Sequence, residues 1–173
     1  MRILGIDPGY AIMGYGLIDK IGNSFKPVDY GVIKTKAGEP LPERLLKIRM
    51  ELSSIVEKYR PDEMAVEELF FNTNSKTVIH VAESRGVALV EGAVRGINVN
   101  EYTPLQVKQG VVGYGRAQKV QVMQMVKVLL NLESVPKPDD AADALAVDDL
   151  DPLDVVVCLH GMDRAAHLDV LTF

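Results

Sequence analysis

Two aspartates spaced for shared chemistry, Asp140 and Asp143, lie in the stretch DDAADALA of residues 139–146. On a helix, a spacing of three places both carboxylates on one face, and the rest of that face is alanine. Two acids arranged in this way can hold a hard cation such as Mg²⁺, which takes oxygen ligands. A simpler interpretation is also open: Asp139 or Asp140 caps the helix, and Asp143 is a solvated first-turn acid favoured by the helix dipole.

Two further acids stand at the ends of apolar runs far away in the sequence. Asp7 closes the run 2–6, and Glu67 lies near the end of the run 64–69. An acid at the end of a buried strand is costly to desolvate unless it has a partner or a metal. If the two strands are neighbours, the acids can share one sheet face about 5 Å apart. Taken alone, Asp7 is also consistent with an ordinary turn aspartate in Asp-Pro-Gly.

The four acids together would suit metal-dependent phosphoryl chemistry. Four crowded carboxylates repel one another and raise their pKa values unless a cation is present. Two divalent metals about 3.5–4 Å apart can activate a water and stabilise the leaving oxygen of an in-line displacement.

The charges of the chain are unevenly distributed. The net charge is −5, which alone argues against nucleic acid as a partner. Residues 133–173, however, carry ten acids and two bases, so residues 1–132 have a net charge of +3. Residues 103–132 contain no acid and four bases: Lys108, Arg116, Lys119 and Lys127. A basic segment facing an acidic cluster is what a metal-dependent phosphodiesterase would need.

Composition and hydrophobic periodicity predict one α/β domain. The 173 residues are 47% hydrophobic and 25% charged, as in a globular protein. No apolar run approaches the roughly 20 residues of a membrane helix, and the N-terminus does not resemble a signal peptide. The lone Cys158 fits a reducing cytoplasm.

Alternating and helical patterns predict five strands (2–6, 12–18, 28–36, 64–69, 97–102) and helices at 41–59, 75–94, 104–111 and 117–131, followed by the acidic helix. This order indicates a mixed five-stranded sheet with helices on both faces.

Five ordered motifs give this chain a specific resemblance. They are RILGIDPG (residues 2–9), MAVEELF (64–70), ESRGV (83–87), VKQGVVGYG (107–115) and DAADALA (140–146). In these motifs the chain resembles the RuvC family of Holliday junction resolvases. The resemblance implies a ribonuclease-H-like fold and paired, symmetric cleavage of four-way DNA junctions in recombination and repair. It also implies a homodimer, and an encounter with the RuvA–RuvB branch-migration complex.

Residue by residue, the family's catalytic, metal-holding acids fall on Asp7, Glu67, Asp140 and Asp143. The resemblance implies Mg²⁺, two ions per site, with Mn²⁺ as a substitute. The family's catalytic-site lysines fall on Lys108 and Lys119, which, with Arg116, are also expected to bind DNA. A lysine near the scissile phosphate offsets transition-state charge; the alternative is an exposed helix lysine.

Two further features of the family fall on Phe70 and on the helix expected over residues 75–94. Phe70 occupies the position of an aromatic residue that, in the family, contacts the centre of the junction, where it could stack on an unpaired base. The alternative is a core phenylalanine. The helix with Val78, Val81, Val87 and Leu89 resembles the dimer helix, and its alternative is burial against its own sheet. A two-fold dimer suits a substrate that is cut on two opposed strands.

The resemblance ends near Val147. Residues 148–152 read DDLDP, and these acids and the proline end the helix. We therefore expect a resolvase domain at 1–147 and an atypical acidic tail at 148–173. The tail is either a replacement specific to a lineage or the product of a changed reading frame. In both cases the helix with Asp140 and Asp143 loses length and buried surface.

Two other functions are also consistent with parts of the sequence. One is a junction-binding dimer whose cleavage is impaired by the altered C-terminus. The other is an actin- or sugar-kinase-like ATPase, which shares the strand–turn–strand start around GIDPG but needs a second phosphate loop and a longer, repeated chain.

Overall fold

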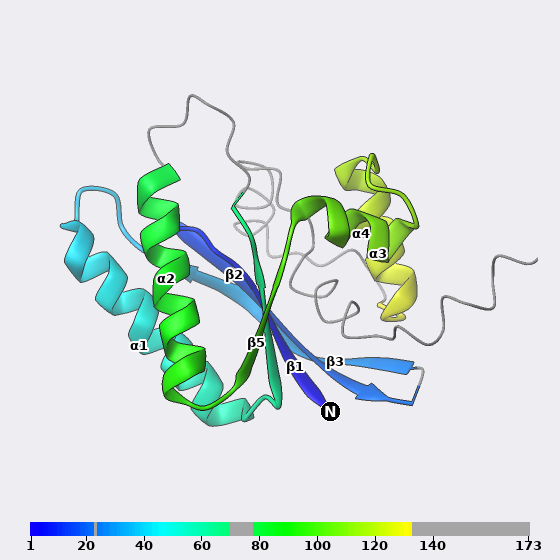
Figure 1. The fold of residues 1–173 in the computed structure, drawn as a ribbon, viewed down its shortest axis with the longest axis horizontal. Helices are drawn as coiled ribbons and strands as arrows, with labels where there is room; N and C mark the ends of the chain where they lie inside the picture. Colours follow the sequence, from blue (N-terminus) through cyan, green and yellow to red (C-terminus); the bar gives the residue numbers. More distant parts are fainter. Residues whose placement is uncertain (23, 70–77, 133–173) are drawn as a thin grey trace, which may run out of the picture.

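The computed structural model describes residues 1–22, 24–69 and 78–132, and these contain five strands and four helices (Figure 1). The strands are β1 (Arg2–Asp7), β2 (Ile12–Ile21), β3 (Ser24–Lys34), β4 (Glu63–Glu67) and β5 (Asn98–Tyr102). The helices are α1 (Leu41–Tyr59), α2 (Val78–Val94), α3 (Pro104–Val112) and α4 (Lys119–Leu129). In the described part of the chain, no helix combines the length and hydrophobicity needed to span a membrane.

The strands form one mixed sheet in the order β3-β2-β1-β4-β5. The antiparallel meander of β1, β2 and β3 is followed by β4, which pairs with β1 in parallel, and by β5, which pairs with β4 in parallel. The predicted mixed five-stranded sheet is therefore confirmed, and its first strand lies at the centre.

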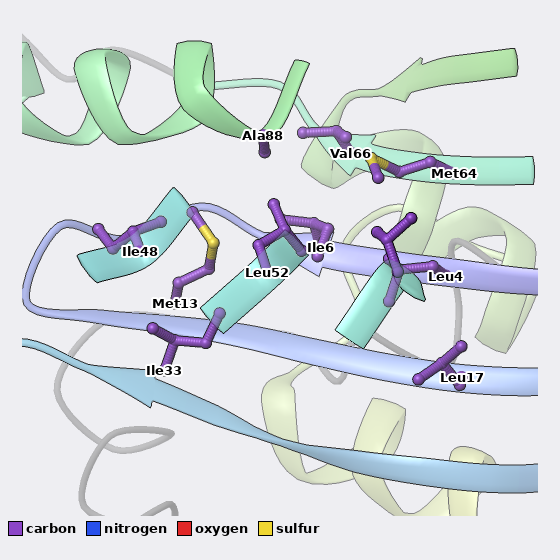
Figure 2. Close-up of a cluster of buried hydrophobic side chains, with 11 residues drawn as sticks. Leu4, Ile6, Met13, Leu17, Ile33, Ile48, Leu52, Met64, Val66 and Ala88 are labelled. Atoms are coloured by element: carbon purple, nitrogen blue, oxygen red, sulfur yellow. The ribbon is translucent and has the colours of Figure 1, made fainter. Parts of the chain in front are cut away.

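Alternating side chains of the central strands build a core on each face of the sheet. Leu4 and Ile6 of β1 belong to a buried cluster with Ile48 and Leu52 of α1 and Ala88 of α2 (Figure 2). Figure 1 shows α1 and α2 together on this side of the sheet and α3 and α4 on the other side.

The second core uses the other set of side chains from the same strands. Ile3 and Ala65 pack with Val107 of α3 and with Val122 and Val126 of α4. The expectation of helices on both faces is confirmed.

The element bounds follow the predictions closely in α1 and less closely in the hairpin. Helix α1 has the predicted bounds, because Pro61 follows it and Arg60 takes the left-handed conformation that ends it. Strands β2 and β3 are longer than expected at their shared turn, because the backbone ladder continues through polar residues as far as Ile21 and Ser24. Strand β4 ends at Glu67, two residues before the predicted end.

A buried leucine of α1 tests the first core. Leu52 is fully buried, and Leu52→Ala removes methyl groups from a packed cluster, so we expect unfolding in urea to require about 2–5 kcal/mol less free energy. Leu46→Ala is the matched control, because Leu46 on the same helix is 55% exposed; its effect should stay within about 0.5 kcal/mol. Equal effects of the two substitutions would contradict the assigned core.

An ion pair ties the start of β1 to β2 and makes stability depend on pH. Arg2 donates from Nε and Nη2 to the two Asp19 carboxylate oxygens at 2.8 and 2.9 Å, and from Nη1 to the Tyr59 carbonyl at 2.9 Å. These hydrogen bonds lower the pKa of Asp19 below its ordinary value of 3.8. The carboxylate therefore stabilises the fold above that value, and the contribution is lost as the pH falls through the lowered pKa.

Asp19→Asn should consequently destabilise the protein by about 1 kcal/mol at pH 7 and by progressively less below pH ~4. Urea unfolding of both proteins from pH 7 to pH 2 measures this difference. A difference that does not change with pH would show that the charge of Asp19 is not responsible.

Candidate functional site

Asp7 and Glu67 lie side by side at the carboxyl ends of two central strands. Ile6 of β1 is in register with Val66 of β4, so the next positions along this parallel pair are Asp7 and Glu67. Neighbouring strands are about 4.8 Å apart, and alternation places both side chains on the face of Ile3 and Ala65. Asp7 is 7% exposed and Glu67 is half-buried. The condition on which the sequence argument depended, that these two strands are neighbours, is confirmed.

Glycines flank Asp7 on the neighbouring strand and in the turn that follows it. On its other side, Asp7 is in register with Gly14 of β2, which has no side chain. Pro8 cannot donate to the ladder, so β1 ends there. A Cβ atom on Gly9 would lie 1.8 Å from the Ile12 carbonyl oxygen, so this tight return into β2 requires glycine.

Further hydrogen bonds hold this turn against the end of β3. The Thr35 amide donates to the Ala11 carbonyl at 2.9 Å, and the Thr35 hydroxyl donates to the Tyr10 carbonyl at 2.6 Å. Both bonds join the turn to Thr35, the residue that follows β3.

The end of β4 is held from two sides. The Glu68 amide donates to the Tyr102 carbonyl of β5 at 2.8 Å, and Arg85 Nε of α2 donates to the Glu67 carbonyl at 2.9 Å. Glu68 follows the last residue of β4 and is exposed. The backbone of Glu67 is therefore fixed by both neighbouring elements.

The basic segment predicted to face the acids lies on the helices that cover their side of the sheet. Lys108 is a half-buried residue of α3, Arg116 is exposed between α3 and α4, and Lys119 is the first residue of α4. Thr103 caps α3 by accepting from the Gln106 amide, and this fixes where the helix starts after β5. The segment 104–129, which packs on the face of Asp7 and Glu67, thus contains four bases and no acid.

The other predicted site residues, Phe70, Asp140 and Asp143, lie outside the described residues, as does Asp139. Within the described part of the chain, no group of three or more metal-binding side chains is assembled. Asp7 and Glu67 provide carboxylate oxygens, which suit Mg²⁺ or Mn²⁺ and not a soft metal. The donor type of these two residues therefore fits the predicted cation.

Sequence reasoning missed two arginines that contact the backbone around these acids, Arg44 and Arg85. A signal for Arg44 was available, because it precedes Ile48, Leu52 and Val56 at intervals of four on the buried face of α1. Arg85 lies inside the ESRGV motif, which was noted only for its resemblance.

Comparison with known proteins identifies the family. The model of the family named crossover junction endodeoxyribonuclease RuvC matches residues 3–148. This chain belongs to the RuvC family. A crossover junction endodeoxyribonuclease RuvC from Alkaliphilus oremlandii is 61% identical over 147 residues, 85% of this chain and 90% of that protein. The RuvC of Alkaliphilus metalliredigens is 58% identical over the same shares.

Solved RuvC structures share the fold over nearly the whole chain. The structure of Thermus thermophilus RuvC in complex with a Holliday junction substrate is 33% identical, with a TM-score of 0.79 and 93% of each chain covered. Another Thermus thermophilus RuvC structure is 31% identical, with a TM-score of 0.77 over 93% of this chain and 95% of that one. The ribonuclease-H-like fold expected from the sequence is thereby confirmed.

The turn that follows Asp7 can be tested at Gly9. Gly9→Ala forces the turn to move away from the Ile12 carbonyl, so we expect a loss of about 1–3 kcal/mol in unfolding free energy by urea titration. Gly86→Ala is the control, because a Cβ there meets nothing within 4 Å and alanine is the better helix former, by up to about 1 kcal/mol. A Gly9→Ala protein as stable as wild type would contradict the tight turn.

Proposed function

We propose that this chain is a structure-selective endonuclease that resolves four-way DNA junctions by paired, symmetric cuts in recombination and repair. The observation that carries this proposal is the adjacent pair Asp7 and Glu67 at the strand ends of a RuvC fold, faced by basic helices. The reaction adds water across a phosphodiester bond, leaving one new end with the phosphate and the other with a hydroxyl.

Asp7 and Glu67, completed by Asp140 and Asp143, hold Mg²⁺ in this proposal, two ions per site, with Mn²⁺ as a substitute. A bound divalent cation supplies Lewis acidity for phosphodiester hydrolysis. The strand ends keep the two described carboxylates at fixed positions, so little reorganisation is needed when the scissile phosphate arrives.

The cations and the aromatic residue have separate roles. Lys108 and Lys119 stabilise the negative charge that develops on the phosphate. Arg116 contacts the DNA backbone, and Phe70 stacks on a base at the junction centre. Residues 1–147 form the catalytic domain in this proposal, and residues 148–173 form a separate acidic tail.

A homodimer built on α2 fits a two-fold substrate. Ile79, Val90 and Val94 are 69%, 56% and 64% exposed, and their spacing along α2 places them on one side of the helix. Val87 and Leu89, by contrast, pack against the first core, so these two residues contact their own chain and not a second copy. The side of α2 that points away from its own sheet is therefore available to a second copy. In this proposal the protein acts in the cytoplasm and meets the RuvA–RuvB branch-migration complex there.

The test compares a labelled four-way junction with a linear duplex of the same sequence. Wild-type protein should nick opposed strands of the junction and leave the linear duplex uncut. It should do so with Mg²⁺ and not with EDTA. Glu67→Gln and Asp7→Asn should lower the single-turnover rate constant by roughly 100-fold or more, because each removes a charged ligand. Glu68→Gln is the matched control, since Glu68 is the exposed neighbour of Glu67 and should cleave as wild type.

The other outcomes of these experiments lead to different conclusions. Junction binding without cleavage would favour the junction-binding dimer, and restored cleavage after residues 148–173 are replaced by an apolar helix would locate the defect in the tail. A folded protein that neither binds nor cuts junctions would refute the assignment. An equal loss of rate in Glu68→Gln would refute the specific role of Glu67.

A further inference from the structure

We propose that Arg44 and Arg85 are positioning residues. They hold the backbone at the two described acids from the face of the sheet opposite the acid side chains. This inference rests on the function proposed for Asp7 and Glu67. It assigns a role to a pair of arginines, one from α1 and one from α2, that contact backbone atoms at or just after these acids.

Arg44 is almost completely buried and is bonded to the turn after Asp7. Its side chain is 6% exposed, its Nε donates to the Thr35 hydroxyl at 2.7 Å, and its Nη2 donates to the Tyr10 carbonyl at 3.2 Å. Its guanidinium carbon lies 4.0 Å from the centre of the Tyr10 ring, a cation–π contact. Tyr10 is held by both its carbonyl and its ring, three residues after Asp7.

Burial alone would favour an apolar residue at position 44. The position continues the face of Ile48, Leu52 and Val56, where removing a guanidinium from water is unfavourable. What an arginine adds is a planar set of directed donors that can hold two oxygens at once. The Tyr10 carbonyl accepts from both Thr35 and Arg44, so the turn is held by β3 and α1 together.

Arg85 makes the equivalent contact at the second acid. Besides its 2.9 Å bond to the Glu67 carbonyl, it forms an ion pair with Glu101 of β5, and its side chain is 18% exposed. Arg85 thereby connects α2 with β4 and β5 at the residue where β4 ends.

Both arginines approach from the face opposite the acid side chains. Helices α1 and α2 cover the side of Leu4 and Ile6, whereas alternation directs Asp7 and Glu67 to the side of α3 and α4 (Figure 1). The hydrogen bonds of the arginines to Glu67 and to the turn after Asp7 are to backbone carbonyls, and neither bonds to an acid carboxylate there. Their effect on the reaction is therefore to fix carboxylate position, and a displacement of about 1 Å can lower a rate roughly 100-fold.

The experiment uses full-length Arg44→Met, Arg44→Lys, Arg85→Met and Arg85→Lys, with Lys47→Met as control. Lys47 lies on α1 and pairs with Glu51 at 3.6 Å, so its loss removes a cation without touching the turn. Three quantities are measured: the single-turnover cleavage rate constant with Mg²⁺, the junction Kd with Ca²⁺, and Mn²⁺ binding without DNA by titration calorimetry.

For positioning residues, we expect the Met variants to cleave roughly 10- to 100-fold more slowly and to bind Mn²⁺ more weakly, with an unchanged junction Kd. The Lys variants should recover part of both losses, because an ammonium group can restore one donor to the carbonyl. Lys47→Met should match wild type in all three measurements. Where a Met variant does not fold, the Lys variant at that position carries the test.

Folded variants with wild-type cleavage and wild-type Mn²⁺ binding would overturn the proposal. A junction Kd that weakens in step with cleavage would also overturn it, since the arginine would then act on DNA. If wild-type protein cuts no junction, the proposed nuclease function fails. The positioning role can then still be tested by Mn²⁺ binding, provided that Asp7→Asn abolishes this binding and so shows that it occurs at the acids. Wild type that neither cuts nor binds Mn²⁺ would refute both.

Discussion

The parallel register between β1 and β4 brings Asp7 and Glu67, the two described acids of the proposed site, side by side. Because Ile6 is level with Val66, the following residues of the two strands are two carboxylates on one face of the sheet. A slip of one residue in either strand would send one of them to the opposite face, into the packed side chains of α1 and α2. The apolar alternation that buries Leu4 and Ile6 on one side and Ile3 on the other therefore also fixes the acids. Stability and site geometry depend on the same register.

The two faces of the sheet contribute different things to the site. The side of α1 and α2 supplies the larger described core and the arginines that hold the strand ends. The side of α3 and α4 bears the two acids, with Lys108 on α3 and Arg116 between the two helices. Such a division keeps the bases of α3 and α4 apart from the core that α1 and α2 form on the other face.

Local patterns predicted the elements well, and long-range features less well. Helix α1 could be placed to the residue, because its period is regular and Pro61 ends it. The pairing of β1 with β4 could only be stated as a condition, since residues 60 apart carry no local signal of their contact. Arg44 was missed because an arginine in an amphipathic helix is normally solvated, and only the fold shows the carbonyl that it bonds. The roles of Phe70, Asp140 and Asp143 stay predictions from the motifs that contain them.

The sheet separates two hydrophobic clusters that share strands but not helices. Helices packed on opposite sides of a sheet are about two layers, or roughly 20 Å, apart, so changes in one layer reach the other only through the strands. Energetic effects at such distances usually add independently. Apolar substitutions beneath α1 and α2 can therefore change stability without displacing the opposite face of the sheet. Arg44 and Arg85 are the exceptions, because their bonds to the Tyr10 and Glu67 carbonyls connect this layer with the ends of β1 and β4.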